Sequence, residues 1–414
     1  MRILFIHTFY RLPGGEDAVL QNEMDLLKSL GHEVELLAFD NKDRGLCKLL
    51  LMYFNPFSYR KTKSKVKEFQ PDVVHIHNLH FAASASVIYA IRSAKIPMVM
   101  TIHNYRLLCP SASLFYKGSL FLDSLASRFP WSAVRKGVYQ NSKLITFWLA
   151  FSTYIHKKIH TYDLVDKFIF LNPHSKQLFL VSSFEVAESK CVIKPNYLLD
   201  TKVSMRPKKD TFFLFIGRLT EEKGVHTLLK AFEDSSIWLK IAGIGPLQSV
   251  VEEYAQRNSN IEYLGQQSRE EVGRLLDDAE ALIFPSIWYE TFGMTIVEAF
   301  AKAVPVITSY LGNMKVIVTN QVNGLLFEPG NASELRSKVE EFYAAPAILK
   351  ARIRQNARAS YEQNYTSEIN AIKLLAIYNS CVPIHHITTI LPLFHFLPQQ
   401  REQDFKPDLN EYKR

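Results

Sequence analysis

The sequence predicts an α/β protein of two domains, each built on a parallel β-sheet with helices on both faces. Short apolar runs of strand length alternate with longer segments of helical period, which is the pattern of such sheets. The alternation starts again near residue 210, after a polar stretch that contains Pro195 and Pro207. The chain has 414 residues, 47% of them hydrophobic, so it is long enough to bury two cores.

The apolar runs predict strands in both halves of the chain. In chain order they lie at residues 2–6, 34–39, 73–77, 98–102 and 167–171, and then at 212–216, 237–241, 261–264, 281–284 and 304–307. The segments between them are expected to be helical. We expect an N-terminal domain over 1–203, a second domain over 204–365, a helix over 366–380 that returns to the N-terminal domain, and a tail over 381–414 that the pattern does not assign.

Composition and charge narrow the class of protein. The net charge of +8 is compatible with nucleic acid, an anionic membrane surface or phosphorylated substrates as partners. No zinc-finger spacing or Arg-rich tail is present and the basic residues occur in both halves, so we expect no nucleic-acid partner. The four cysteines stand far apart and suggest no disulfide framework, which fits a reducing, cytoplasmic location. The apolar run before His7 is too short for a signal peptide, and no run of about 18 apolar residues predicts a membrane-spanning helix.

The segment from Phe284 to Glu298 carries the most chemical information. A strand is predicted to end at Phe284 and a helix to open shortly afterwards, so Glu290 lies at the helix mouth and Glu298 two turns along. The N–H groups at a helix N-terminus commonly bind phosphate. In this segment those amides belong to Phe292, Gly293, Met294 and Thr295. For either glutamate alone, a helix cap or a solvated helix face is the simpler interpretation.

Two further turns follow predicted strands. Arg218 and Lys223 come just after the strand at 212–216, where open parallel sheets bind ligands, and two cations there can hold a diphosphate. Gly14 and Gly15 follow the first strand and precede an amphipathic helix, which permits close backbone approach to a phosphate. In isolation, a solvated basic turn and an ordinary glycine turn compete with these interpretations.

Several histidines lie near strand ends. His103 follows the strand at 98–102, so its imidazole is expected to reach the same edge of the sheet, although a structural histidine is the commoner case. His75, His77 and His80 look like metal ligands, but only Asp72 is near enough in sequence to complete a set. We therefore favour a structural role over a metal site.

Missing motifs argue against other enzyme classes. The sequence has no Asp-x-Asp pair to hold a divalent ion on a nucleotide diphosphate, and no Gly-x-x-x-x-Gly-Lys-Ser/Thr phosphate loop. The segment Gly243-Ile-Gly245 lacks the third glycine of a dinucleotide fingerprint. Kinase and dehydrogenase interpretations lose support, and we expect neither a metal nor a cofactor.

Together these stretches resemble the retaining glycosyltransferases of family 4, whose GT-B fold has two Rossmann-like domains with parallel sheets facing across a cleft. The resemblance extends from Met1 to about Cys381. It depends on Pro13-Gly14-Gly15-Glu16, Gly31-His-Glu-Val34, Asp72-Val-Val-His75, the segment Thr101 to Pro110, Lys194-Pro-Asn196, Gly217-Arg-Leu-x-x-x-Lys-Gly224 and the pair Glu290 and Glu298. The last two motifs together are the specific ones.

On the donor side, the resemblance implies that Arg218 and Lys223 bind the diphosphate of a nucleotide-sugar, either UDP- or GDP-linked, and act in place of a metal. Glu298 would bind the ribose hydroxyls and Glu290 the hydroxyls of the transferred sugar.

On the other side, the resemblance implies that Gly15 approaches the phosphate and that His103 contacts the sugar near the reacting centre. The acceptor, a saccharide or lipid-linked saccharide, would face His77 and Asn78, with further roles for Glu16 and Asn196. Lipopolysaccharide or other surface-polysaccharide assembly is the expected setting.

Two alternatives stay open at this point: a sugar-nucleotide epimerase of the same architecture, and a non-catalytic sugar-nucleotide binding protein. A location at the inner face of the cell membrane is also compatible with the sequence. Aromatic residues at 147–154 lie between lysines and are typical of a membrane-surface segment, although burial in a core explains them almost as well.

Overall fold

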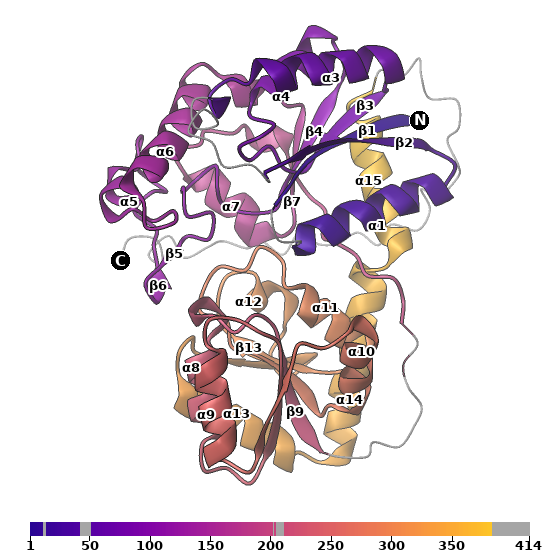
Figure 1. The fold of residues 1–414 in the computed structure, drawn as a ribbon. Helices are drawn as coiled ribbons and strands as arrows, with labels where there is room; N and C mark the ends of the chain where they lie inside the picture. The colour runs from indigo at the N-terminus through magenta and orange to yellow at the C-terminus, as the bar shows by residue number, and fades with distance from the viewer. Residues whose placement is uncertain (11–13, 42–50, 202, 204–210, 383–414) are drawn as a thin grey trace. The chain divides into compact units, whose positions relative to one another are not determined.

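The computed structural model describes residues 1–10, 14–41, 51–201, 203 and 211–382, and the chain forms two compact units (Figure 1). The first unit contains Met1–Leu114, Phe121–Pro195 and the C-terminal segment from Asn370, and the second contains Phe115–Leu120 and Asn196–Ile369. Of the polar stretch predicted to link the domains, 194–210, residues 202 and 204–210 lie outside the described residues, as do residues 383–414 of the predicted tail.

The first unit is built on a parallel sheet of six strands in the order β2-β1-β3-β4-β7-β8. Its strands are β1 (Arg2–Phe9), β2 (Glu33–Asp40), β3 (Val73–Ile76), β4 (Met98–Ile102), β7 (Lys167–Phe170) and β8 (Cys191–Ile193). Sequence analysis found the first five of these and missed β8, which has three residues. Because the chain moves to the other side of β1 after β2, a topological switch point lies between β1 and β3, where such sheets bind ligands.

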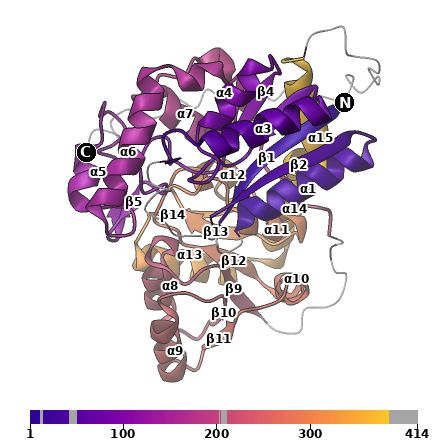
Figure 2. The same cartoon turned by 45° about the horizontal axis from the view of Figure 1, so that its top comes forward.

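Helices cover both faces of this sheet: α1 (Gly15–Ser29), α3 (Pro56–Phe69), α4 (Ser86–Ser93), α5 (Trp131–Lys136), α6 (Lys143–Lys158), α7 (Pro173–Val181) and α15 (Ser367–Asn379). One face packs against α1 and the C-terminal helix α15 in a single core, whereas α3 and α4 lie on the other face (Figures 1 and 2). Asparagine caps set helix starts here, since Asn55 and Asn172 each accept a backbone hydrogen bond directly before a proline at the first helical position.

The second unit repeats the scheme with a parallel sheet in the order β11-β10-β9-β12-β13-β14. Its strands are β9 (Phe212–Ile216), β10 (Trp238–Ala242), β11 (Ile261–Gly265), β12 (Ala281–Phe284), β13 (Val306–Ser309) and β14 (Gly324–Phe327). Strands β9 and β12 have the predicted bounds, β13 begins two residues later than predicted, and β14 was not predicted. The switch point lies between β9 and β12.

Helices of the second unit also lie on both faces. One face carries α8 (Val225–Phe232), α9 (Gln248–Arg257) and α13 (Ala332–Ala344), and the other carries α10 (Arg269–Asp278), α11 (Met294–Ala301) and α14 (Ala347–Asn364) (Figures 1 and 2). The short helix α12 (Met314–Ile317) follows β13, and a separate hairpin joins β5 (Phe115–Tyr116) to β6 (Ser119–Leu120). The predicted α/β class with two parallel sheets is confirmed. Within the described residues, no helix is long and apolar enough to cross a membrane.

Candidate functional site

The first group of candidate residues lies where β9 and β12 end, at the switch point of the second unit. These two strands are parallel neighbours, so the turn after Ile216 and the loop after Phe284 emerge at the same edge of the sheet. The turn carries Lys223, and the loop carries Glu290. The topology therefore brings together two residues that are 67 positions apart.

Glu290 and Lys223 form a buried ion pair. Glu290 is 5% exposed, and its Oε1 accepts hydrogen bonds from Lys223 Nζ at 2.6 Å, Ser286 Oγ at 2.7 Å and Trp288 Nε1 at 2.8 Å. The ammonium of Lys223 also lies over the rings of Phe284 and Trp288, 5.3 and 5.6 Å from their centroids. Three donors on one carboxylate oxygen fix both side chains in place.

The backbone holds the two loops together at Gly224. The amide of Ile287 donates to the carbonyl of Glu222 at 2.9 Å, and Gly224 has φ +71°. A Cβ on Gly224 would lie 1.9 Å from the carbonyl oxygen of Pro285, which is far inside van der Waals contact. Only glycine allows this approach, and it places Lys223 beside the loop of Glu290.

Helix α11 supplies amides next to this pair. Gly293, with φ +94°, caps the helix, Met294 begins it, and Thr295 follows in the first turn. The carbonyl of the buried Phe292 accepts a hydrogen bond from Asn313 Nδ2, which fixes the chain before the cap. The peptide N–H groups of the first turn have no partner within the helix, so this end is suited to an anion.

Glu298 and Arg218 lie near the same sheet edge but outside the ion pair. Glu298 is partly buried on α11, and burial raises its pKa while Arg269 acts in the opposite direction. Arg218 is exposed, and its one ion pair among the described residues is with Glu222 at 3.5 Å. The structure thus joins Lys223 to Glu290 directly and leaves the Arg218 guanidinium on the surface.

Gly14 and Gly15 lie at the start of α1 in the first unit. Gly14 caps the helix, and its own amide donates to Asp17 Oδ2 at 2.8 Å. Both glycines are exposed, and no heavy atom lies within 4 Å of a Cβ built on either. The backbone is therefore open to a ligand, although neither glycine has the positive φ that would require the residue type.

Glu16 and Asn78 form a polar contact beside this helix start. Asn78 Nδ2 donates to Glu16 Oε1 at 3.0 Å and to the carbonyl of Thr8 at 2.8 Å. Burial, with a contribution from the neighbouring Asp17, raises the pKa of Glu16 to about 7. Asn196, for which the resemblance also implies a role, is buried, and its Oδ1 has no hydrogen-bond partner among the described residues.

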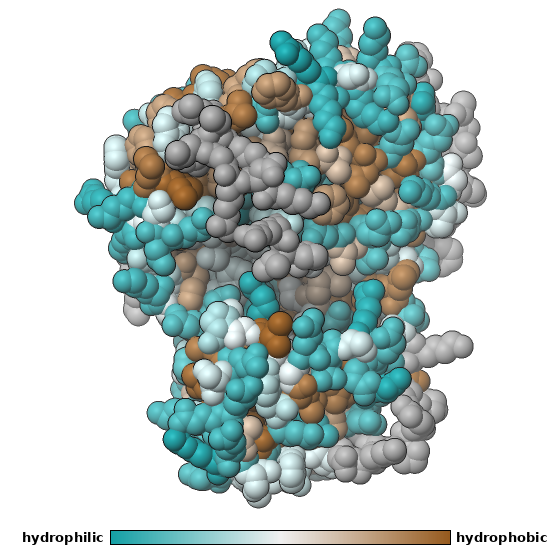
Figure 3. All heavy atoms as spheres, viewed as in Figure 1, coloured by the Kyte–Doolittle hydropathy of each residue, from teal (hydrophilic) through white to brown (hydrophobic). Residues whose placement is uncertain are grey.

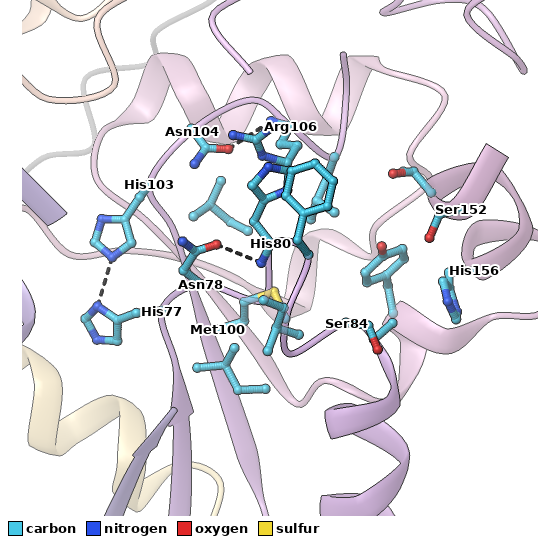
Figure 4. Close-up of a pocket in the computed structure, with 18 of the residues that line it drawn as sticks. His77, Asn78, His80, Ser84, Met100, His103, Asn104, Arg106, Ser152 and His156 are labelled. Carbon is cyan, nitrogen blue, oxygen red and sulfur yellow. Dashed lines mark hydrogen bonds between the residues drawn. The ribbon is translucent and has the colours of Figure 1, made fainter. Parts of the chain in front are cut away.

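His103 is held by a chain of buried polar groups. Its Nε2 lies 2.9 Å from His77 Nδ1, and His77 Nε2 lies 3.4 Å from Glu23 Oε2 (Figure 4). The other oxygen of Glu23 accepts from Lys194 Nζ at 2.5 Å, and both of these side chains are almost fully buried. Burial alone would raise the pKa of Glu23, but the Lys194 ammonium and the imidazoles of His77 and His75 keep it well below its usual range.

The chain of groups fixes the protons on the imidazoles. His77 Nε2 lies 3.4 Å from a carboxylate oxygen of Glu23, which can only accept, so a proton on Nε2 leaves Nδ1 as the acceptor for His103 Nε2–H. Burial, with the neighbouring His77, holds the pKa of His103 well below its usual range, so its ring is neutral and its Nδ1 lone pair is unprotonated. Both nitrogens of His77 face protein groups, so His77 acts on a ligand through His103.

Sequence analysis did not identify Glu23. It lies on the apolar face of α1 among the buried residues Leu20, Met24 and Leu27, and a charged residue at a core position of an amphipathic helix was the available signal. His75 is also part of this cluster, with Tyr378 and Thr101 hydroxyls each 2.7 Å from its ring nitrogens.

In the part of the chain that the structure describes, two sets of side chains have the composition of a metal site: Glu23 with His75 and His77, and His7 with Glu16 and Asp17. In the first set the Lys194 ammonium already occupies one oxygen of Glu23, so a cation would compete with a buried lysine. In the second set His7 Nε2 and Asp17 Oδ1 are hydrogen-bonded to each other at 2.8 Å. Both sets are accounted for by contacts within the protein.

Comparison with known proteins identifies the fold. A family model described as glycosyl transferases group 1 matches residues 199–360, and one described as glycosyltransferase family 4 matches residues 13–167. The solved structure of sucrose-phosphate synthase from Thermosynechococcus elongatus superposes with a TM-score of 0.67 at 17% identity, over 92% of this chain and 98% of that one. HepE from Anabaena, solved with UDP-glucose, gives a TM-score of 0.62 at 17% identity, over 92% and 100%.

The chain has the GT-B fold. Its two units each contain a match to a glycosyltransferase family. Among curated relatives, the O-antigen chain mannosyltransferase C of Escherichia coli is 31% identical over 163 residues, which is 38% of this chain and 44% of that protein. The chain matches less than half of the length of the first curated relatives.

The close approach at Gly224 of this GT-B protein predicts the effect of adding one methyl group. Gly224→Ala should lower the free energy of unfolding by about 2–4 kcal/mol, because a backbone clash adds to the strain of a positive φ. Gly265→Ala is the matched control, since Gly265 has φ +66° but no heavy atom within 4 Å of its Cβ position. Urea unfolding measures both variants, and equal losses of stability would contradict the account of Gly224.

The contacts of His103 with His77, and of His77 with Glu23, predict one tautomer of His103. Nitrogen-15 NMR at neutral pH should show His103 protonated on Nε2 and unprotonated on Nδ1, and this should persist on acidification through the ordinary histidine pKa near 6.5. In a Glu23→Gln/Lys194→Met double variant, which removes both buried charges together, the preference should weaken. A proton on His103 Nδ1 in the unaltered protein would show that the assignment is wrong.

Proposed function

We propose that the protein is a retaining glycosyltransferase of family 4 that moves a sugar from a nucleoside diphosphate donor to a hydroxyl of a saccharide or lipid-linked saccharide, without a metal. The observation that carries the proposal is the buried pair of Lys223 and Glu290 beside the amides of α11, in a chain whose two units match glycosyltransferase families. The predicted carboxylate and cation thus meet in one site.

The donor diphosphate binds at the second unit. Lys223 and Arg218 supply positive charge, and the amides at Gly293, Met294 and Thr295 supply hydrogen bonds. Negative charge grows on the leaving diphosphate as the anomeric bond breaks, and charges that are already in place favour that transition state over the ground state. Arg218, exposed in this structure, reaches the phosphate from the surface of the turn.

Glu290 has two tasks in this scheme. Its Oε1 holds Lys223, and its other oxygen, Oε2, accepts from hydroxyls of the transferred sugar. Glu298, further along α11, binds the ribose hydroxyls of the nucleotide. Its pKa is raised by burial, so hydrogen bonds from ribose hydroxyls would favour its ionised form.

The first unit provides the remaining contacts. In this unit the backbone at Gly14 and Gly15 is open to a ligand, and the unprotonated Nδ1 of His103 is available to accept a hydrogen bond from a sugar hydroxyl. Because His77, Glu23 and Lys194 fix its ring, His103 is presented in one orientation and one protonation state.

Relatives suggest the donor and the setting. HepE was solved with UDP-glucose, and the Escherichia coli relative is named as an O-antigen chain mannosyltransferase. We therefore propose a UDP- or GDP-sugar as donor and assembly of a surface polysaccharide, such as lipopolysaccharide, at the cytoplasmic side of a membrane.

Transfer and donor binding test the proposal together. UDP or GDP, alone or as its sugar, should raise the melting temperature of the protein, because a ligand that binds only the folded state stabilises it. Lys223→Met should reduce turnover about 10²-fold or more, as expected for loss of one preorganised charge. Lys338→Met is the control, since Lys338 pairs with Glu341 on α13 and lies outside the site.

The outcomes separate the alternatives. Undiminished transfer by Lys223→Met would contradict the role of the ion pair. Conversion of the donor to an isomeric sugar nucleotide without an acceptor would identify an epimerase. Donor binding without any product would identify a binding protein.

A basic aromatic surface on the first unit supports the membrane location. Trp131 of α5 and Leu144 of α6 are 53% and 58% exposed, and the exposed basic residues Arg135, Lys136, Lys143 and Lys158 belong to the same two helices. Figure 3 shows hydrophobic residues on the surface over α5 and α6, at the left of the view. Exposed apolar side chains among basic ones favour an anionic lipid surface.

Vesicle binding tests this surface. The protein should co-float with vesicles that contain anionic lipid at low salt and much less at high salt. Each basic residue near the surface contributes about 1 kcal/mol of attraction to anionic lipid, and salt screens this attraction. Leu144→Glu should weaken binding, whereas Leu30→Glu, at a 49% exposed position after α1, should not. Absence of binding at low salt would exclude the membrane proposal and leave the transfer reaction untouched.

A further inference from the structure

The first unit contains a pocket of about 130 Å³ at the ends of β3 and β4 (Figure 4). His103 and His77 lie at one end of it, and Ser152 and His156 of α6 lie at the other. A second pocket of about 20 Å³ shares Arg106, Leu107 and Thr153 with the first. Arg106 therefore stands where the two pockets adjoin.

Arg106 is a cation whose hydrogen-bonding capacity is largely unused. Its Nε and Nη1 are buried and have no partner among the described residues, and its Nη2 lies 3.4 Å from the hydroxyl of Tyr10. Its guanidinium lies 5.6 Å from the centre of the Tyr139 ring. Buried N–H groups without acceptors cost free energy, and a planar guanidinium is the natural partner of a carboxylate or phosphate.

The other polar groups of the larger pocket do not neutralise Arg106. Burial lowers the pKa of His80, His103 and His156, so these imidazoles are neutral at physiological pH, and the asparagines and serines carry no charge. The positive charge of Arg106 acts to lower the pKa of Glu16, but burial raises this pKa to about 7. Glu16 Oε1 accepts a hydrogen bond from Asn78 and not from Arg106. No carboxylate of the described chain forms an ion pair with Arg106.

The smaller pocket adds further positive charge. Its walls include Arg128 and Lys157, and Lys157 Nζ donates to Ser183 Oγ at 3.0 Å. Arg128 lies shortly before α5, and Lys157 lies in the last turn of α6. A negatively charged group that enters along this path meets only cations and neutral residues of the lining.

We propose that these adjoining pockets bind the acceptor and that the acceptor carries an oxyanion, a carboxylate or a phosphate, held by Arg106. The inference rests on the proposed function and narrows it to a substrate class. His103 Nδ1 and Arg106 line the same pocket, so a sugar hydroxyl and a nearby anionic group are bound by one surface. Selection among acceptors then follows charge as well as sugar shape.

Binding of small probes to the full chain tests the inference without requiring transfer. Titration calorimetry compares phenyl glucuronide, phenyl phosphate and the neutral phenyl glucoside in the absence of donor. The unaltered chain should bind at least one anionic probe about tenfold or more tightly than the glucoside, as expected for charge-assisted hydrogen bonds. Preference for the glucuronide identifies a carboxylate acceptor, and preference for the phosphate identifies a phosphate-linked one.

Variants assign the preference to Arg106. Arg106→Gln should remove it and leave glucoside binding unchanged, whereas Arg106→Lys, which keeps the charge but loses the planar fork, should retain part of it. Arg92→Gln, at an exposed position on α4, is the matched control. The melting temperature and circular dichroism of each variant establish that it is folded.

Equal affinity for all three probes, no binding of either anionic probe, or an anion preference that survives in Arg106→Gln would each overturn the inference. Stabilisation by UDP or GDP, measured on the same samples, is the separate test of the proposed function. A protein that binds the nucleotide but no anionic probe would keep the transferase proposal and lose the anionic acceptor.

Discussion

An ammonium buried against a carboxylate, Lys223 with Glu290, is the contact on which the site of the second unit depends. Removing one member of such a pair leaves an uncompensated charge and costs several kcal/mol. Neither side chain can therefore leave without the other, and the contact of Gly224 with Pro285 keeps their loops in register. In the proposed reaction, a diphosphate at α11 would meet a cation whose position is already fixed, so little reorganisation would be needed as charge develops.

The first unit buries a second lysine–glutamate pair and uses it differently. Lys194 and Glu23 are inaccessible, so they touch no ligand, and their charges cancel within the core. The second oxygen of Glu23 instead lies 3.4 Å from His77 Nε2, and His77 Nδ1 in turn contacts His103. In the second unit the pair places the charge of Lys223 at the site. In the first unit the pair of Lys194 and Glu23 helps to orient His103, whose neutral imidazole lines a pocket.

The extent of sequence prediction follows from where the information lies. Strands β9 and β12 were found with their bounds because five or four consecutive apolar residues suffice to mark a buried parallel strand. Strands β8 and β14 lie at the sheet edges, where three residues in one case and an initial glycine in the other give a weak apolar signal. The bounds of β13 were displaced because the apolar run begins before the strand does.

Site residues divide in the same way. Lys223 and Glu290 were recognisable because each follows an apolar strand closely, where the sheet edge gathers ligand-binding groups. Glu23 was not recognised because its role depends on Lys194, which is 171 residues away in the sequence. Arg106 was not recognised because the sequence does not show that its Nε and Nη1 lack a partner among the described residues. Sequence spacing does not record such tertiary relations.

Electrostatic repulsion between the two proposed substrates links the site residues to the proposed acceptor class. A departing diphosphate and an anionic acceptor repel each other, so each requires its own cation during the reaction. In the proposed reaction Lys223 and Arg218 would serve the first and Arg106 the second, while His103 stays neutral because burial depresses its pKa. The neutral ring can accept a hydrogen bond from a sugar hydroxyl at Nδ1 without adding positive charge beside it. In the proposed reaction, the depressed pKa of His103 and the Arg106 guanidinium, which has no ion pair among the described residues, then belong to one arrangement: positive charge lies at the anions and not at the sugar hydroxyl.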